Sequence, residues 1–390
     1  MMVKLSLRGA VLLGVLFVFG CGASSTVKEP AFAKATAGGS GSLSLVSGEL
    51  LKEANLEVVW TNKVPMRKGE TLKQLFIAGE RIYCLSTRLR VARYGGQGGN
   101  YITALSGQKG TIVFSRELSP AGLPVVGWEL YDDELFSVVG GELVEIDPQS
   151  GKEISAERLE SGAVCAAARN RRYFYVGGAD KQVHALRAND KVRLFRAGAE
   201  NGSAIVSIIA DKDFVVFATD GGNVVSFTAD GPKQLWQFYA SDAIVGPIAR
   251  DESSLFVASK DTNVYRLDIR TGKLIWKHQT AAVLDKGPVV TDSVVYQYVR
   301  DKGLTALDKE NGKALWQLAG GVDLLAEAGG KAYVITDKKT LVVMDNKKGT
   351  QLYSVNFAGV SKYTTNTKDS KMYIANEDGR VACIKPMEDR

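Results

Sequence analysis

Aromatic residues recur along this 390-residue chain at intervals of about 40 residues. The repeated position is held in turn by Phe114, Ser155, Phe195, Trp236, Trp276, Trp316 and Tyr353, with spacings of 41, 40, 41, 40, 40 and 37 residues. Most copies run from a short alternating apolar stretch through a turn to the aromatic residue, and residues 306–316 (ALDKENGKALW) are the clearest copy. A repeat of this length built from short strands indicates a β-propeller with one four-stranded blade per repeat.

The two ends of the chain predict how the ring closes. Trp60 lies in a strand-like run, 56–62, that stands too far before Phe114 to belong to the same blade. Two further strand-like runs, 371–375 and 380–384, end the chain without an aromatic strand after them. We expect residues 56–62 to supply the outer strand of this last blade, which leaves no free edge in the ring. The prediction is an all-β, eight-bladed propeller over residues 56–386 with four-stranded antiparallel blades.

The repeated turn explains why an aromatic residue follows it. An Asp such as Asp268 can accept hydrogen bonds from backbone amides ahead of it, and a Gly four residues later, such as Gly272, tolerates a positive φ. The ring then reaches an outer strand and can pack on a neighbouring blade. The residues predicted to act as structural pegs are Trp60, Phe114, Trp236, Trp276, Trp316 and Tyr353. Because the Asp recurs in successive blades, we interpret it as a turn former and not as a catalytic acid.

The N-terminus has the features of an export signal. Lys4 and Arg8 precede an apolar stretch, 9–20, which is too short to span a membrane. Residues 18–21 (VFGC) resemble the bacterial lipobox, in which the cysteine becomes the acylated first residue. A plain secretion signal cut near Ala23 is the alternative. We predict a signal peptide over 1–20, lipidation at Cys21 and a flexible tether over 21–55, which is rich in Ala, Gly and Ser.

Charge, cysteine and histidine content argue against several functions. The net charge of the whole chain is +6. Without the leader, 47 basic and 43 acidic residues give a net charge of +4. A charge this small does not suggest a nucleic-acid binder. Besides Cys21, the cysteines are Cys84, Cys165 and Cys383, and each lies in an apolar strand. We expect buried thiols, with a Cys84–Cys383 disulfide as the alternative. Two distant histidines, His184 and His278, do not have the spacing of a zinc site, and no local motif supports a hydrolase.

The pattern Ala-x-Asp-x-x-x-Gly-Lys-x-x-Trp, complete at 306–316 and partial in the other blades, resembles the tryptophan-docking repeat of the pyrroloquinoline-quinone (PQQ)-like eight-bladed propellers. The resemblance covers nearly all of 56–386. One branch of that family, the quinoprotein dehydrogenases, binds PQQ and calcium on the propeller axis. This chain has no adjacent cysteine pair, and none of that branch's cofactor residues can be matched to a position here. A small PQQ- and calcium-dependent quinoprotein enzyme stays an alternative.

The other branch, the BamB-like lipoproteins, shares the acylated cysteine, the tether, the length and the compact blades. The resemblance implies a scaffold without a catalytic site, cofactor or metal, monomeric within a complex. Its implied partners are the barrel-inserting subunit of the outer-membrane assembly machine and unfolded barrel proteins. The residue after Cys21 is Gly22, whereas an Asp at that position retains lipoproteins at the inner membrane. The resemblance therefore implies an outer-membrane anchor facing the periplasm. The alternatives are the extracytoplasmic face of the inner membrane and, for function, an envelope sensor or adhesion propeller.

An insertion distinguishes the first blade. Its second and third strands are joined by a connection, within 86–101, that is much longer than its counterparts in the other blades. Strand order places this insertion on the same rim as the crossovers between blades, and repeat proteins often bind partners through such insertions. The candidate partner-binding residues are Arg88, Arg90, Arg93 and Tyr94. A solvated tip without a binding role is the alternative.

Overall fold

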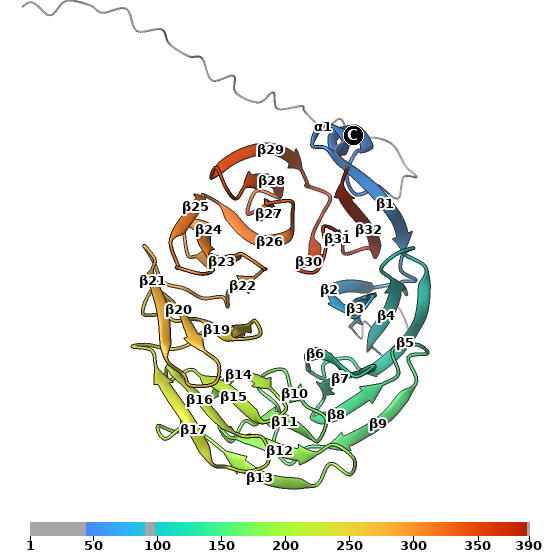
Figure 1. The fold of residues 1–390 in the computed structure, drawn as a ribbon. Coiled ribbons are helices and arrows are strands. Elements are labelled where there is room, and N and C mark those ends of the chain that lie inside the picture. The colour runs from blue at the N-terminus through green and yellow to red at the C-terminus, as the bar shows by residue number, and fades with distance from the viewer. Residues whose placement is uncertain (1–43, 90–97, 388–390) are drawn as a thin grey trace, which may run out of the picture. The chain divides into compact units, whose positions relative to one another are not determined.

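Residues 44–89 and 98–387 are described in the computed structural model. They form eight antiparallel sheets of four strands each, which are arranged as the blades of a ring (Figure 1). The first strand of each blade lies toward the middle of the ring and the fourth lies on the outside (Figure 1). The predicted all-β, eight-bladed propeller is confirmed.

Blades 1 to 7 follow the order of the chain. Blade 1 consists of β2 (Glu70–Ala78), β3 (Arg81–Arg88), β4 (Gly99–Ser106) and β5 (Ile112–Pro120). Blade 2 consists of β6 (Val125–Tyr131), β7 (Glu134–Val139), β8 (Glu142–Ile146) and β9 (Glu153–Arg158). Blade 3 consists of β10 (Ala168–Arg169), β11 (Tyr173–Gly177), β12 (Val183–Arg187) and β13 (Arg193–Ala197). Blade 4 consists of β14 (Ile205–Ala210), β15 (Phe214–Thr219), β16 (Asn223–Thr228) and β17 (Gln234–Tyr239).

The second half of the ring repeats this plan. Blade 5 consists of β18 (Ala249–Arg250), β19 (Ser254–Ala258), β20 (Asn263–Asp268) and β21 (Leu274–Gln279). Blade 6 consists of β22 (Val289–Val290), β23 (Val294–Val299), β24 (Gly303–Asp308) and β25 (Ala314–Leu318). Blade 7 consists of β26 (Gly321–Ala328), β27 (Lys331–Thr336), β28 (Thr340–Asp345) and β29 (Thr350–Asn356). Blade 8 combines β30 (Lys362–Thr364), β31 (Met372–Ala375) and β32 (Arg380–Pro386) with β1 (Leu56–Lys63).

Blade 8 closes the ring with strands from both ends of the chain. β1 pairs antiparallel with β32, from Leu56 opposite Pro386 to Lys63 opposite Arg380. The predicted closure is confirmed. Every blade therefore has four strands, and β1 occupies the outer position that no later part of the chain fills.

A short helix, α1 (Gly48–Glu53), lies within the stretch that the sequence predicts as tether. Leu51 on this helix is buried and shares a core cluster with Phe357 and with Leu56. The tether predicted for 21–55 therefore extends too far, because apolar residues near its end pack on blades 7 and 8. The Ser and Gly residues around them in the sequence suggest a linker. Among the residues described, no helix is long and apolar enough to cross a membrane.

The repeated turns have the predicted hydrogen bonds. In the β20–β21 turn, Asp268 Oδ1 accepts the backbone N–H of Thr271 at 2.8 Å, and the N–H of Gly272 donates to the Asp268 carbonyl at 2.9 Å. Gly272 has a φ of 68°, a conformation that favours glycine. The same Asp-to-amide bonds form in the turns of three other blades, at Asp147, Asp308 and Asp345.

The aromatic pegs dock on the turn of the following blade. A Cβ added to Gly312 would lie 2.7 Å from the ring of Trp276, so only glycine leaves room for the indole. Trp276 Nε1 also donates to the carbonyl of Lys309 at 2.9 Å. Close ring-to-glycine contacts of this kind recur three more times, for Trp60 on Gly110, Phe114 on Gly151 and Trp236 on Gly272. These four rings and Trp316 are each at most 9% exposed, which fits their predicted structural role.

Tyr353 differs from the other predicted pegs because its side chain is 40% exposed. The reason lies in the closure of the ring. Its neighbour, blade 8, takes β32 and β1 from opposite ends of the chain, so no turn joins these two strands and no turn glycine can receive a ring. The assignment of Tyr353 as a peg does not hold in the structure.

The three cysteines within the described residues, Cys84, Cys165 and Cys383, are buried free thiols. Cys84 and Cys383 belong to the same core cluster, so their blades are neighbours as expected, but the two sulfurs are not bonded to each other. Burial raises the pKa of Cys383 to about 12, and it raises the pKa of Cys165 to about 12 as well. Such thiols are inert at neutral pH.

Candidate functional site

The blade 1 insertion has a firmly held base. Asn100 donates from Nδ2 to Ser119 Oγ at 3.0 Å and to the carbonyl of Leu123 at 3.1 Å, in the crossover to blade 2. Arg88, the last residue of β3, pairs with Gly99 across the hairpin. The other predicted binding residues, Arg90, Arg93 and Tyr94, lie outside the described residues. Their role in binding stays a prediction.

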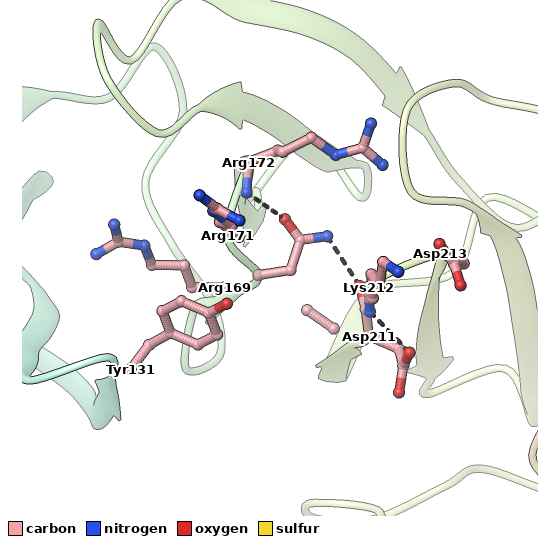
Figure 2. Close-up of a pocket in the computed structure, with 9 residues that line it drawn as sticks. Tyr131, Arg169, Arg171, Arg172, Asp211, Lys212 and Asp213 are labelled. Carbon is pink, nitrogen blue, oxygen red and sulfur yellow. Dashed lines mark hydrogen bonds between the residues drawn. The ribbon is translucent and has the colours of Figure 1, made fainter.

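A cavity of about 780 Å³ opens where blades 2, 3 and 4 meet. Its walls come from the turns that join the first and second strands of these blades, at 131, 169–172 and 210–213. Since strand direction alternates within a blade, these turns lie on the rim opposite the blade 1 insertion. Figure 2 shows Tyr131 and Arg169 on one side of the cavity and Asp211, Lys212 and Asp213 on the other.

Asn170 fixes the two turns that face each other across this cavity. This buried side chain accepts the backbone N–H groups of Arg172 and Tyr173 at 2.9 Å each, and it donates to the carbonyl of Asp211 at 2.8 Å (Figure 2). It also donates to Tyr175 Oη at 3.1 Å. The carbonyl oxygen and the NH2 group of this buried amide are therefore both hydrogen-bonded. These bonds make the cavity wall rigid across the boundary between blades 3 and 4.

The mouth of the cavity carries more positive than negative charge. Arg171, Arg172 and Lys212 are exposed, and among the residues with described positions they form no ion pair. Asp211, in contrast, is engaged by Arg250 of blade 5 at 3.1 Å. Guanidinium groups bind carboxylates through paired N–H donors, and Arg and Tyr are common anchors at protein interfaces. The arrangement can bind an acidic segment of a protein surface.

His184 and the acidic side chains are the groups to consider for a catalytic or metal site. In the described part of the chain, no group of three or more His, Cys, Asp or Glu side chains could hold a metal ion. His184 Nε2 contacts both carboxylate oxygens of Asp180 at 2.9 Å, and within 44–89 and 98–387 no serine hydroxyl is hydrogen-bonded to its ring. This His–Asp pair therefore lacks, among the described residues, the nucleophile that a Ser–His–Asp arrangement requires.

Comparison with known families identifies the relationship. The family model for "Outer membrane protein assembly factor BamB" matches residues 35–164, 139–245 and 220–323, which together extend over more than half of the chain. The chain belongs to the BamB family.

Individual BamB relatives are distant. BamB of Yersinia pestis is 29% identical over 143 residues, and the match spans only about a third of either protein, 34% of this chain and 36% of the relative. The crystal structure of BamB from Moraxella catarrhalis has a TM-score of 0.65 at 15% identity, covering 86% of this chain and 99% of the other. The computationally designed protein Ika8 has a TM-score of 0.61 at 16% identity, covering 83% and 98%. The two structural matches support the fold.

Sequence reasoning did not identify the cavity residues. It assigned no binding role to 169–172 or to 211–213. One signal was present, because Arg171 and Lys212 are one repeat apart and so occupy equivalent turns of adjacent blades. Two charged turns separated by the repeat length are expected to lie side by side on a rim.

Proposed function

We propose that this protein is a non-enzymatic scaffold that assists assembly of β-barrel proteins in the bacterial outer membrane. Membership of the BamB family is the observation that carries this proposal. Its partners would be the barrel-inserting subunit of the assembly machine and unfolded barrel proteins. The propeller supplies a rigid ring with two rims, and a rigid surface reduces the entropy lost on binding.

The cavity rim between blades 3 and 4 is the proposed docking surface. Arg171, Arg172 and Lys212 present exposed cations, without an ion-pair partner among the described residues, on turns that Asn170 holds in place. The blade 1 residues Arg88, Arg90, Arg93 and Tyr94 are proposed as a second contact on the opposite rim. An acidic patch on the periplasmic region of the barrel-inserting subunit would satisfy the first surface, and this complementarity mainly speeds association.

A lipid anchor would hold the scaffold at the membrane. We propose acylation at Cys21 after removal of residues 1–20, with the protein facing the periplasm from the outer membrane. The test is metabolic labelling with a palmitate analogue, followed by separation of the membranes. Label in the wild type and none in Cys21→Ala supports the anchor, whereas equal label in both, or none in either, contradicts it. Recovery with the inner membrane would instead support the extracytoplasmic face of that membrane.

The docking proposal is tested by affinity capture of the tagged, full-length protein from gently solubilised envelopes. We expect the barrel-inserting subunit to be recovered with the wild type and lost with Arg171→Ala/Arg172→Ala/Lys212→Ala. The matched control, Lys233→Ala/Lys273→Ala/Lys313→Ala, removes the same charge from exposed turns of blades 4, 5 and 6 and should retain the subunit. Absence of the subunit at every salt concentration contradicts the assembly role, and equal loss in the control contradicts the docking surface.

The enzymatic alternative has its own test. A ligand that binds the folded state raises the melting temperature. Since we expect no binding, addition of PQQ with calcium should leave the melting temperature unchanged. A rise that depends on PQQ concentration would contradict the non-enzymatic scaffold.

A further inference from the structure

The seam between blades 2 and 3 lacks the ring-and-glycine pair that joins other blades. Ser155 stands on β9 at the peg position, and Lys191 stands in the β12–β13 turn near the place where other blades have the turn glycine. Lys191 has a φ of 56°, in the left-handed region that costs a non-glycine residue about 1 kcal/mol or more. A lysine retained in such a conformation indicates that its side chain has a role.

Charged side chains fill this seam. Glu145 of β8 lies directly opposite Ser155, and its side chain is only 4% exposed. Glu145 Oε1 accepts the Ser155 hydroxyl at 2.6 Å and lies 2.6 Å from Lys191 Nζ. Glu145 Oε2 accepts Arg169 Nη1 at 3.2 Å, and the same nitrogen contacts Glu134 of β7. Blade 2 thus supplies two carboxylates and blade 3 supplies two cations.

Both cations of the cluster lie against the ring of the same aromatic residue, Phe174. The guanidinium of Arg169 lies 4.5 Å from the ring centre of Phe174, and Lys191 Nζ lies 4.9 Å from it. Their side chains are 11% and 10% exposed, so both cations need a carboxylate partner: Lys191 has Glu145, and Arg169 has Glu145 together with Glu134. Removing one member of a buried ionic cluster leaves the others unpaired, which makes the cluster stiff in its native geometry.

Arg169 connects this seam to the cavity. It lines the cavity wall and begins the turn that carries Arg171 and Arg172 (Figure 2). β10 contains only Ala168 and Arg169, so few ladder hydrogen bonds hold that turn. The Arg169 side chain, clamped by Glu134 and Glu145, adds a second anchor for this turn beside the hydrogen bonds of Asn170.

We propose that Glu145 and Lys191 are positioning residues for the cavity rim. Glu145 holds Arg169, and Lys191 holds Glu145 in place; together they set the position of the arginine-bearing turn 169–172 relative to the facing turn 210–213. The exchange of an aromatic peg for an ionic cluster at this seam therefore serves binding. This inference rests on the proposed docking function of the cavity.

The test restores the ordinary peg at this seam in the full-length protein. Glu145→Ala/Ser155→Trp/Lys191→Gly copies the arrangement of blade 6, where Ala306 pairs with Trp316. We expect its melting temperature to stay near the wild-type value while its affinity for the purified periplasmic region of the barrel-inserting subunit falls about tenfold. Tyr353→Ala, on the exposed side chain at the seam between blades 7 and 8, is the control and should bind like the wild type. Wild-type affinity in the triple variant would overturn the inference, and no binding by the wild type would instead overturn the docking proposal.

A second variant keeps the inference testable if the triple variant fails to fold. Glu145→Gln preserves shape and removes the charge that holds Arg169 and Lys191. Hydrogen exchange measured by mass spectrometry should become faster in peptides covering 169–173 and stay unchanged in the matching turn of blade 6. Glu145→Asp, which keeps the charge, should restore part of the protection. Unchanged exchange at 169–173 in Glu145→Gln would overturn the positioning role whether or not the partner binds.

Discussion

Two seams of the same ring solve one packing problem differently. Between blades 5 and 6, the indole of Trp276 lies against Gly312 and donates to the Lys309 carbonyl at 2.9 Å. Between blades 2 and 3, Ser155 and Lys191 replace the ring and the glycine, and Glu145 binds the lysine at 2.6 Å. The first seam is held by apolar burial and the second by buried charge.

The comparison teaches where a repeat protein can depart from its repeat. The Trp276 peg contacts the turn between the third and fourth strands of the next blade, at Gly312 and Lys309. The ionic seam reaches Arg169 and through it the cavity rim. This departure from the repeat therefore adjoins the proposed docking surface.

The largest expected effect comes from breaking the apolar seam. Trp276→Ala removes a buried ring and leaves a cavity, so it should lower the free energy of unfolding by about 3–5 kcal/mol. Chemical denaturation measures the change. The control is Tyr353→Ala, whose side chain is 40% exposed and should cost about 0.5 kcal/mol or less. Equal losses for the two variants would contradict the peg role of Trp276.

Breaking the ionic seam should cost slightly less. Glu145→Ala leaves Lys191 and Arg169 without their shared carboxylate, and we expect a loss of about 3 kcal/mol in the same denaturation assay. The control is Glu153→Ala, which removes an exposed ion pair with Arg116 and should cost under about 1 kcal/mol. A loss at Glu145 no greater than at Glu153 would show that the buried cluster does not support the seam.

Two tryptophans sharpen the apolar side of the comparison. Trp316 Nε1 donates to Asn346 Oδ1 at 2.9 Å, whereas Trp236 Nε1 is buried without a partner among the residues described. Trp316→Phe should therefore cost about 1–2 kcal/mol more in the free energy of unfolding than Trp236→Phe. Equal costs would mean that the indole hydrogen bond of Trp316 contributes nothing to the stability of the contact between the two blades.

The smallest expected effect is the loss of stability in acid that comes from protonation of Asp268. The hydrogen bond from the Thr271 hydroxyl and those from the Thr271 and Arg270 amides hold the pKa of Asp268 below its ordinary value, although burial acts in the opposite direction. The folded state then binds this proton less readily than the unfolded state, so the stabilisation is present above about pH 4 and is lost as pH falls through the folded pKa. Urea denaturation at pH 7 and pH 3 should show a slightly smaller acid loss for Asp268→Asn. An identical loss would contradict the assignment.

Much of the fold follows from the sequence, because the Asp-Gly turn and the ring recur at a fixed interval. The closure of blade 8 follows as well, from the unmatched strands around Trp60 and at the C-terminus. Other features depend on contacts between blades. The absence of an aromatic residue at Ser155 is visible in the sequence, but the pairing of Glu145 with Lys191 is not, since it forms across a seam. For the same reason, the hydrogen bond from Asn170 to the Asp211 carbonyl does not follow from the sequence, although the repeat spacing predicts that the two turns lie on adjacent blades.

The assembly role is tested most directly by the abundance of barrel proteins in the outer membrane. The measurement is quantitative mass spectrometry of outer membranes from the source bacterium after deletion of the gene, with complementation by variants. We predict lower levels of barrel proteins in the deletion strain, restored by the wild type and not by Arg171→Ala/Arg172→Ala/Lys212→Ala expressed at the same level. Unchanged barrel-protein levels after deletion would contradict the assembly role, and full restoration by the triple variant would contradict the cavity rim as its docking surface.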